Sequence, residues 1–222
     1  MQDVDVELRR RSKNIIVYTG VIGFQDGLDC LCRILHRLRY DLGRDDFLCV
    51  VVGDGDALPQ VKALARELRL GENVSFTGWI DDSKRYLRYL NTADICVCPE
   101  PFNDYNDRST FVKVMEYMAA GKPIVGFELA ETRFSAQDSA LYVGANDERG
   151  FAVQLARLMD DRVLRLELGQ RGRHRIRKQL AWQYSVTKLL DSYDQCLRIR
   201  PVSRKSSNTR SAQEQPVSLP LE

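Results

Sequence analysis

Short apolar segments alternate with longer segments of helical periodicity along residues 14–197, and this alternation constrains the fold more than any other feature. In the helical segment at 28–42, leucines recur at three- and four-residue spacing. The apolar segments have the length and β-branched content of buried strands, and they lie at 15–18, 47–52, 74–77, 95–98, 124–127 and 141–143. Strand–helix alternation predicts right-handed βαβ units, and therefore an α/β fold with a Rossmann-like, doubly wound parallel sheet.

Both ends of the chain differ in composition from this middle part. Residues 1–13 are polar and charged, and we interpret them as a flexible lead-in. From residue 198 onward Pro, Ser, Arg and Gln replace the apolar periodicity, which is typical of a disordered segment. The sequence therefore predicts one domain over 14–197, between the lead-in at 1–13 and a disordered tail at 198–222.

Charge and cysteine usage argue against several classes of protein. With 33 basic and 31 acidic residues the net charge is only +2, so we expect no nucleic acid partner. No apolar run approaches the roughly 20 residues of a membrane-spanning helix, and the first residues lack the apolar stretch of a signal peptide. The six cysteines include two C-x-C pairs, which is not the usual spacing of a zinc site, and they indicate buried thiols in a reducing compartment. We therefore expect a cytoplasmic protein without a metal or a cofactor.

Common nucleotide-binding and hydrolytic motifs are incomplete in this chain. Residues 53–55 begin a dinucleotide-binding motif, but Leu58 occupies the position of its third glycine. Gly121 and Lys122 lack the upstream glycine of a P-loop, and Pro123 stands where a hydroxyl residue belongs. No Ser-His-acid order is evident either. A dehydrogenase, a P-loop nucleotidase and a triad hydrolase are therefore disfavoured.

The most informative segment, residues 106–125, has the pattern of a polar loop, a helix, a glycine stop and a strand. Ser109 is a suitable N-cap for this helix, and Gly121 suits its end. Ser109, Lys113 and Glu116 share one stripe of the helix. In a parallel sheet this stripe belongs to the carboxyl edge, where ligands bind in folds of this kind.

Side chains at this edge suit a ligand that carries both phosphate and hydroxyl groups. The free N–H groups of a helix N-terminus attract phosphate, and Arg108 and Lys113 add positive charge. Glu116, one turn further along, can accept two hydroxyl protons at once, as the vicinal hydroxyls of a ribose would offer. The alternative is that Lys113 and Glu116 form only a solvated ion pair at i,i+3 spacing.

The sequence EYMAAGKPIV at 116–125 resembles the donor-binding motif of group 1 (family 4) glycosyltransferases, which have the two-domain GT-B fold. Further resemblance covers 52–55, 74–79 and 93–95, together with Pro99, so that roughly residues 14–197 fit the C-terminal, donor-binding half of that family. The resemblance implies that Glu116 binds the ribose of a nucleoside diphosphate sugar. It also implies transfer of the sugar, with retention, to a hydroxyl acceptor in surface polysaccharide or glycolipid synthesis.

The donor site predicted from the residues and the resemblance together contains eight residues, and no catalytic residue is assigned. They are Gly23, Trp79, Asp107, Arg108, Ser109, Thr110, Lys113 and Glu116.

Three positions depart from the family pattern. The family usually has a second glutamate eight residues before the ribose glutamate, where this chain has Arg108, with Asp107 beside it. The family also carries an arginine and a lysine after the first strand, both of which meet the donor diphosphate. The matching residues here are Val21 and Asp26, so we expect backbone N–H groups at 23–27, with Arg108 and Lys113, to hold the phosphates.

The family's acceptor-binding domain has no counterpart in this sequence, which leaves alternatives open. The main alternative is a non-catalytic module that binds nucleotide sugar, or a truncated accessory chain that needs a separate acceptor domain; a nucleotide-dependent epimerase of similar fold is a third. We expect little sugar turnover by this chain alone. We also expect a homo-oligomer or an acceptor-domain protein as partner, because the predicted last helix, 186–197, has an apolar face. The basic run at 171–178 fits a solvated helix face, or peripheral contact with the inner face of the membrane.

Overall fold

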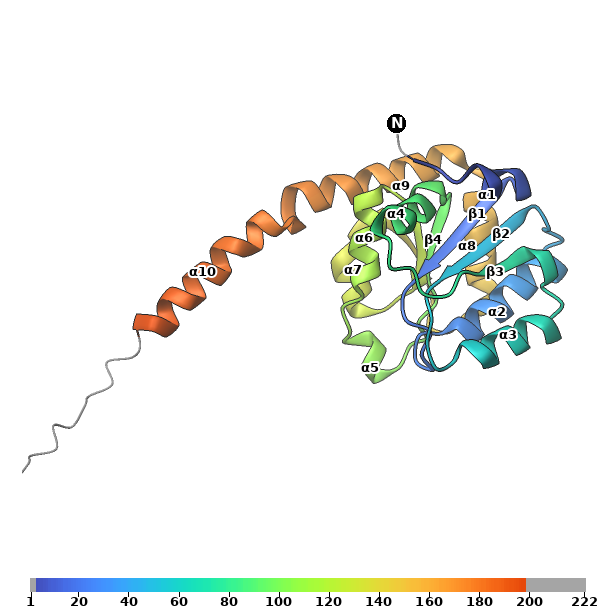
Figure 1. The fold of residues 1–222 in the computed structure, drawn as a ribbon, viewed down its shortest axis with the longest axis horizontal. Helices are drawn as coiled ribbons and strands as arrows, with labels where there is room; N and C mark the ends of the chain where they lie inside the picture. The colour runs from blue at the N-terminus through green and yellow to red at the C-terminus, as the bar shows by residue number, and fades with distance from the viewer. Residues whose placement is uncertain (1–2, 199–222) are drawn as a thin grey trace, which may run out of the picture. The chain divides into compact units, whose positions relative to one another are not determined.

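The computed structural model describes residues 3–198 and contains a six-stranded, all-parallel sheet in the order β3-β2-β1-β4-β5-β6 (Figure 1). Each predicted strand is present to within one or two residues. The strands are β1 (Asn14–Thr19), β2 (Phe47–Val52), β3 (Val74–Phe76), β4 (Ile95–Cys98), β5 (Ile124–Phe127) and β6 (Ala140–Val143). The prediction of an α/β, Rossmann-like parallel sheet is confirmed.

Helices cover both faces of the sheet, as the doubly wound pattern requires (Figure 1). One face packs against α2 (Leu28–His36), α3 (Leu58–Glu67) and α8 (Glu148–Asp160). The other packs against α4 (Ser83–Thr92), α6 (Val112–Ala120) and α7 (Ala130–Ala136), and α9 (Arg162–Arg175) contacts α6. Short helical turns lie at Arg37–Asp41, Gly71–Asn73, Asp104–Asp107 (α5), Gln137–Ser139 and Ile176–Leu180.

The central strand β1 shows why this sequence forms a sheet buried on both sides. All six of its residues are buried, and neighbouring residues join different cores because side chains alternate across a strand. Ile16 and Tyr18 pack with α2 and α3, whereas Ile15 and Val17 pack with α4 and α6. The apolar run is therefore continuous, whereas a strand in a sheet with one solvent-exposed face would alternate apolar and polar residues.

The order of the strands creates a crevice beside β1. The chain runs outward from β1 through β2 to β3, then returns to place β4 on the other side of β1. Because the loops after β1 and β4 lead in opposite directions, the sheet opens between them at its carboxyl edge, and ligands bind at such points in this class of fold.

The predicted lead-in contains a short helix, α1 (Val6–Arg11), that packs on the domain. The Asp5 side chain caps it, Leu8 is buried, and Arg9 forms an ion pair with Asp94. This association was not apparent from composition, because the partner residue is distant in sequence.

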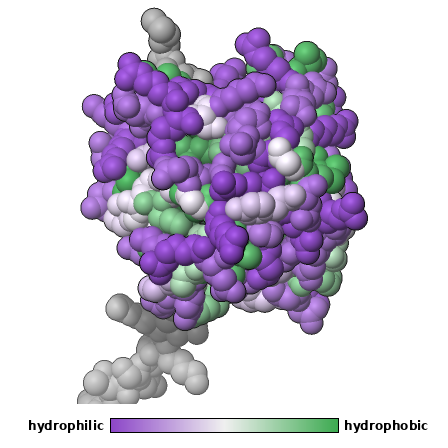
Figure 2. Space-filling view, turned by 90° about the vertical axis from the view of Figure 1, so that its right-hand side faces the viewer, coloured by the Kyte–Doolittle hydropathy of each residue, from purple (hydrophilic) through white to green (hydrophobic). Residues whose placement is uncertain are grey.

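Contacts within the chain divide it after Ala181, whereas the predicted single domain extends to residue 197. Helix α10 (Trp182–Arg198) begins the second unit. The predicted disordered tail lies outside the described residues, apart from residue 198 at the end of α10. No helix within 3–198 is long and apolar enough to cross a membrane. Figure 2 shows one face of the domain, where hydrophobic side chains are scattered among hydrophilic ones.

Candidate functional site

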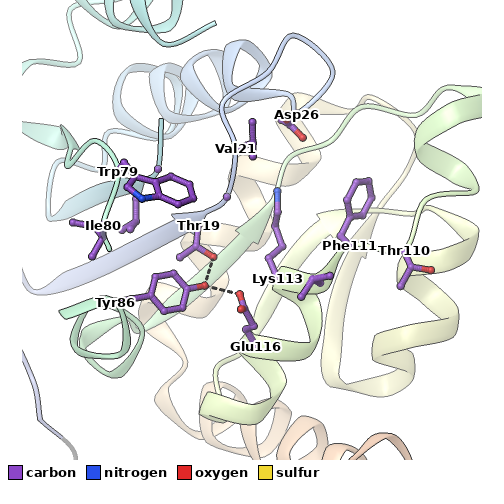
Figure 3. Close-up of a pocket in the computed structure, with 14 residues that line it drawn as sticks. Thr19, Val21, Asp26, Trp79, Ile80, Tyr86, Thr110, Phe111, Lys113 and Glu116 are labelled. Carbon is purple, nitrogen blue, oxygen red and sulfur yellow. Dashed lines mark hydrogen bonds between the residues drawn. The ribbon is translucent and has the colours of Figure 1, made fainter. Parts of the chain in front are cut away.

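A cavity of about 590 Å³ opens at the carboxyl edge of the sheet, beside β1 (Figure 3). Four parts of the chain line it: the loop after β1, the end of β2, the segment from Trp79 into α4, and the first two turns of α6 with the residues before them. The lining comprises Thr19, Gly20, Val21, Asp26, Val52, Gly53, Trp79, Ile80, Tyr86, Thr110, Phe111, Val112, Lys113 and Glu116.

Two glycines allow the loops after β1 and β2 to meet at the floor of the cavity. Gly53 has φ +144°, and a Cβ atom there would lie 1.8 Å from the Gly20 carbonyl oxygen. Gly20 has φ +142°, and its Cβ would lie 3.1 Å from the Lys113 Cε atom. Only glycine combines this backbone conformation with such close approach.

Helix α6 begins at Val112, later than the sequence predicted, and Ser109 is not its N-cap. Phe111 occupies the cap position without a side-chain hydrogen bond, because the Ser109 hydroxyl instead donates to the Tyr105 carbonyl at 2.7 Å. The first N–H groups of a helix have no partner within the helix. Those of α6 therefore begin beside the cavity with no side chain capping them.

Glu116 is held by a tyrosine from the opposite wall of the cavity (Figure 3). The Tyr86 hydroxyl donates to Glu116 Oε2 at 2.5 Å and lies 3.1 Å from Thr19 Oγ1. Burial raises the pKa of Tyr86, and its hydrogen bond to Glu116 raises it further, so the phenol keeps its proton. Oε1 of Glu116 takes no part in this bond, which leaves that oxygen available as an acceptor.

Lys113 extends from α6 toward the loop that carries Val21 and Asp26 (Figure 3). Its ammonium pairs with Glu100, which follows β4 and is completely buried, and it donates to the Tyr18 hydroxyl at 2.9 Å. Although burial opposes the charge of Lys113, the carboxylate of Glu100 raises its pKa above the usual value. Burial raises the pKa of Glu100, against the influence of Lys113, and Glu100 Oε2 has no hydrogen-bond partner.

The structure contradicts the alternative in which Lys113 and Glu116 form a solvated ion pair. Lys113 pairs with Glu100 and is nearly buried, whereas Glu116 binds Tyr86. Both side chains reach the same cavity from one helix face but have different partners.

Four of the eight predicted site residues line the cavity: Trp79, Thr110, Lys113 and Glu116. The Trp79 ring is 65% exposed at the cavity wall, and its Nε1 atom donates to Asp81. Thr110 Oγ1 donates to Glu131 Oε2 at 2.8 Å, which ties the start of this segment to α7.

The other four predicted residues, Gly23, Asp107, Arg108 and Ser109, are not among the residues that line the cavity. Asp107 accepts a hydrogen bond from the Ala130 N–H at 2.7 Å and so caps α7. Gly23 donates its N–H to Asp26 Oδ2 at 2.8 Å, and Arg108 is exposed. The helical turn α5 keeps the residues just before α6 away from the cavity. Hydrogen bonds within this segment, such as the one from the Ser109 hydroxyl to the Tyr105 carbonyl, hold it in its own turn before α6 begins.

Sequence reasoning missed two residues that hold the site together, Tyr86 and Glu100. Tyr86 lies in an ordinary amphipathic helix, and nothing in its local pattern marks it. Glu100 was more accessible to inference, because an acid directly after a buried strand, between Pro99 and Pro101, needs a nearby cation.

The family model described as "Glycosyl transferases group 1" matches residues 13–161. Two curated relatives are lipopolysaccharide core biosynthesis glycosyltransferases of Rhizobium meliloti (strain 1021). LpsE is 27% identical over 153 residues, which are 68% of this chain and 42% of the relative. LpsD is 28% identical over 146 residues, which are 65% of this chain and 40% of the relative. The chain thus spans about two fifths of the length of these relatives.

Solved structures share the fold at low sequence identity. TarM of S. aureus, in a complex that contains UDP, has a TM-score of 0.71 at 14% identity, covering 81% of this chain and 35% of TarM. Sucrose-phosphate synthase of Thermosynechococcus elongatus has a TM-score of 0.70 at 22% identity, covering 89% of this chain and 50% of the synthase. HepE of Anabaena, in complex with UDP, has a TM-score of 0.66 at 14% identity, covering 84% of this chain and 51% of HepE. Because the matched family model spans all six strands of the sheet and the residues that line the cavity, this chain belongs to the group 1 glycosyl transferases.

Proposed function

We propose that the cavity at the carboxyl edge binds a nucleoside diphosphate sugar, and that the chain acts as the donor-binding half of a retaining glycosyltransferase. One observation carries the proposal: Glu116 enters the cavity from α6 with one carboxylate oxygen held by Tyr86 and the other available. A carboxylate fixed in this way can accept hydrogen bonds from the two vicinal hydroxyls of a ribose.

The proposed orientation of the donor follows from the walls of the cavity. The ribose lies on Glu116, and the phosphates point toward the first turn of α6, where uncapped N–H groups attract anions. Lys113 lies one turn before Glu116 on the same side. The exposed Trp79 ring at the opposite wall offers a flat apolar surface to a base.

Relatives and structural neighbours support the same ligand class. The two curated relatives are named for lipopolysaccharide core biosynthesis, which supports a hydroxyl acceptor on a surface polysaccharide or glycolipid. TarM and HepE are described with UDP, which supports a nucleotide as the donor's leaving group.

No group of three or more His, Cys, Asp or Glu within 3–198 is placed to hold a metal ion. The transfer that we propose uses no resident cofactor of the protein.

The acceptor side of the reaction belongs to a surface outside this domain in this proposal. Sugar transfer requires donor and acceptor in near-attack contact, and that positioning accounts for roughly 7–11 kcal/mol of a barrier. The cavity is open at the carboxyl edge, and its rim carries exposed Val21 and Val112. We expect the acceptor-binding surface to close over this rim, from a cytoplasmic partner or a second copy of the chain.

The test is calorimetric titration of the chain with a panel of nucleotides and nucleotide sugars, before and after the substitution Glu116→Ala. We expect a loss of affinity of about tenfold to a hundredfold, because each charged hydrogen bond contributes roughly 1.5–3 kcal/mol. The melting temperature should change little, since Glu116 lies at a cavity and not in the core. Glu67→Ala, at an exposed position on α3, is the matched control and should bind as wild type does. Equal binding by wild type and Glu116→Ala would disprove the proposed role.

A further inference from the structure

The cavity is poor in positive charge for a site that is proposed to hold a diphosphate. One ammonium, from Lys113, and two carboxylates, from Asp26 and Glu116, are the charged groups of its lining. The ammonium is paired with Glu100, directly behind the lining. The lining therefore has a net negative charge whether Glu100 is ionised or protonated, and an ionised Glu100 makes the region more negative.

No other lysine or arginine within residues 3–198 belongs to the lining of the cavity. Arg108 is exposed and lies outside the lining, and Arg133 on α7 pairs with Glu128. The start of α6 contributes the equivalent of about half a positive charge. A nucleoside diphosphate sugar brings about two negative charges, so a deficit of positive charge remains.

Asp26 is the residue that sets this deficit. Its Oδ2 atom accepts the Gly23 N–H at 2.8 Å, which fixes the carboxylate in the loop after β1. It lies close enough to influence both Tyr18 and Glu100, raising the pKa of each as a lesser cause after burial. A carboxylate in this place repels a diphosphate directed at the nearby start of α6.

We infer that the positive charge that neutralises the donor diphosphate comes from outside this domain, from arginine or lysine side chains of a polypeptide surface that docks on the carboxyl edge. The inference rests on the proposed donor-binding function. Charge complementarity identifies the partner surface as cationic, because the cavity it covers is acidic. The rim fits a docked polypeptide as well, since Val21, Trp79 and Val112 are 59%, 65% and 70% exposed around it. The isolated chain then binds the nucleoside part of the donor and gains no affinity from the diphosphate.

The experiment compares nucleosides with their diphosphates on the full chain. Uridine, cytidine, adenosine, guanosine and thymidine, and the diphosphate of each, are titrated calorimetrically at low salt in the presence of EDTA. For the preferred base, we expect the diphosphate to bind wild type no more tightly than the nucleoside. The substitution Asp26→Lys should tighten binding of the diphosphate by about tenfold or more, because it reverses a charge beside the phosphates. Its affinity for the nucleoside should stay the same.

Two further variants separate a local charge effect from a change of fold. Asp26→Asn keeps an acceptor for the Gly23 N–H and removes the charge, so we expect it to tighten diphosphate binding by a smaller factor than Asp26→Lys. Asp56→Lys makes the same charge change at an exposed position after β2, outside the lining, and should have little effect.

Each result has one reading. Wild type that binds a diphosphate at least tenfold more tightly than its nucleoside would overturn the inference, because the chain would then supply the charge itself, while the proposed function would stand. Tightening of the wild-type complex by Mg²⁺ in place of EDTA would also overturn it, in favour of a metal ion carried by the nucleotide. If no nucleoside or nucleotide binds wild type or Asp26→Lys, the proposed function itself fails.

Discussion

The cavities at the two edges of the sheet are lined by side chains of opposite charge balance. At the carboxyl edge, the cavity holds two carboxylates and one ammonium, and Glu116 has an acceptor oxygen outside its bond to Tyr86. At the amino edge, a smaller cavity of about 150 Å³ is lined by four basic side chains and one acidic side chain, Asp94. The basic residues are Arg9, Lys122, Arg162 and Arg165. Both cavities contain charged side chains, and the larger of the two lies at the carboxyl edge.

Helix direction explains the difference. In a parallel α/β fold the helices run opposite to the strands, so their carboxyl ends and unpaired carbonyls gather at the amino edge. Lys122 Nζ donates to the carbonyls of Asn91 and Ala93 at 2.7 and 2.8 Å, at the end of α4. Arg173 donates to the Ala120 carbonyl at 2.7 Å, at the end of α6. These cations complete the helices and so serve the fold, whereas at the opposite edge the N-terminus of α6, beside the cavity, has no side-chain cap from its cap residue.

The basic run at 171–178 contains residues of this structural kind. Arg175, which the sequence placed on a solvated or membrane-facing helix surface, is 8% exposed and donates to the carbonyls of Ser135 and Phe134. Arg171 lies beside Glu167 and Asp138. Part of the positive charge of the run is therefore engaged by groups of the domain itself, which weakens the case for membrane attraction by these residues.

The largest expected effect comes from Gly53→Ala, which would break the carboxyl edge itself. A Cβ atom at this position meets the Gly20 carbonyl oxygen and requires a φ that alanine rarely adopts. We expect a loss of about 4 kcal/mol or more in the free energy of unfolding, or failure to fold. Urea unfolding measures it, and Gly43→Ala is the control, since a Cβ there meets nothing within 4 Å. Equal stability of the two variants would contradict the close approach of the two loops.

Lys122→Met tests whether the amino edge serves the fold alone. The variant leaves two helix-end carbonyls without their donor, so we expect a loss of about 2 kcal/mol in unfolding free energy. Nucleotide affinity should be unchanged, because Lys122 lies at the edge opposite the cavity. Urea unfolding and calorimetry check the two halves of the prediction. A large loss of nucleotide affinity in a stable variant would remove the distinction between the edges.

The stability difference between wild type and Lys122→Met should also depend on pH. Burial lowers the pKa of Lys122 below its ordinary value. Between this lowered value and the unfolded value near 10.4, the unfolded state binds more protons, so the stability contributed by this group rises with pH. We therefore expect the advantage of wild type over the variant to grow as the pH rises from neutral toward the unfolded value near 10.4. An advantage that shrinks over this interval would contradict the assigned direction.

Tyr86→Phe has the smallest expected effect and tests how the carboxyl edge positions its carboxylate. Loss of the hydroxyl frees Glu116 to rotate, and we expect nucleotide affinity to fall about threefold to tenfold, as for one hydrogen bond. The ring stays in place, so the melting temperature should change little. Tyr89→Phe, on the same helix, is the matched control. If Tyr86→Phe binds as tightly as wild type, Tyr86 does not position Glu116.

The sheet and the position of Glu116 were predictable from the sequence because their signals are local. Buried strands of four to six residues produce continuous apolar runs, and these survive any choice of neighbouring strand. The stripe that joins Lys113 and Glu116 follows from helical spacing alone. The failure at Ser109 shows the limit, because its hydroxyl had two acceptable uses, and contacts of α5 selected the one that does not cap α6.

By itself, then, the sequence determined the fold class, the family and the helix face that reaches the cavity, since each depends on periodicity or on a contiguous motif. Only the tertiary structure decided the partners of those side chains. Lys113 and Tyr18 are brought together by neighbouring elements across 95 positions of the chain, and Tyr86 reaches Glu116 across 30. Sequence periodicity does not indicate such pairs, because they arise from the order of the strands and the direction of the helices. That arrangement places the Lys113–Glu100 ion pair behind the cavity and the Tyr86 phenol opposite the Glu116 carboxylate.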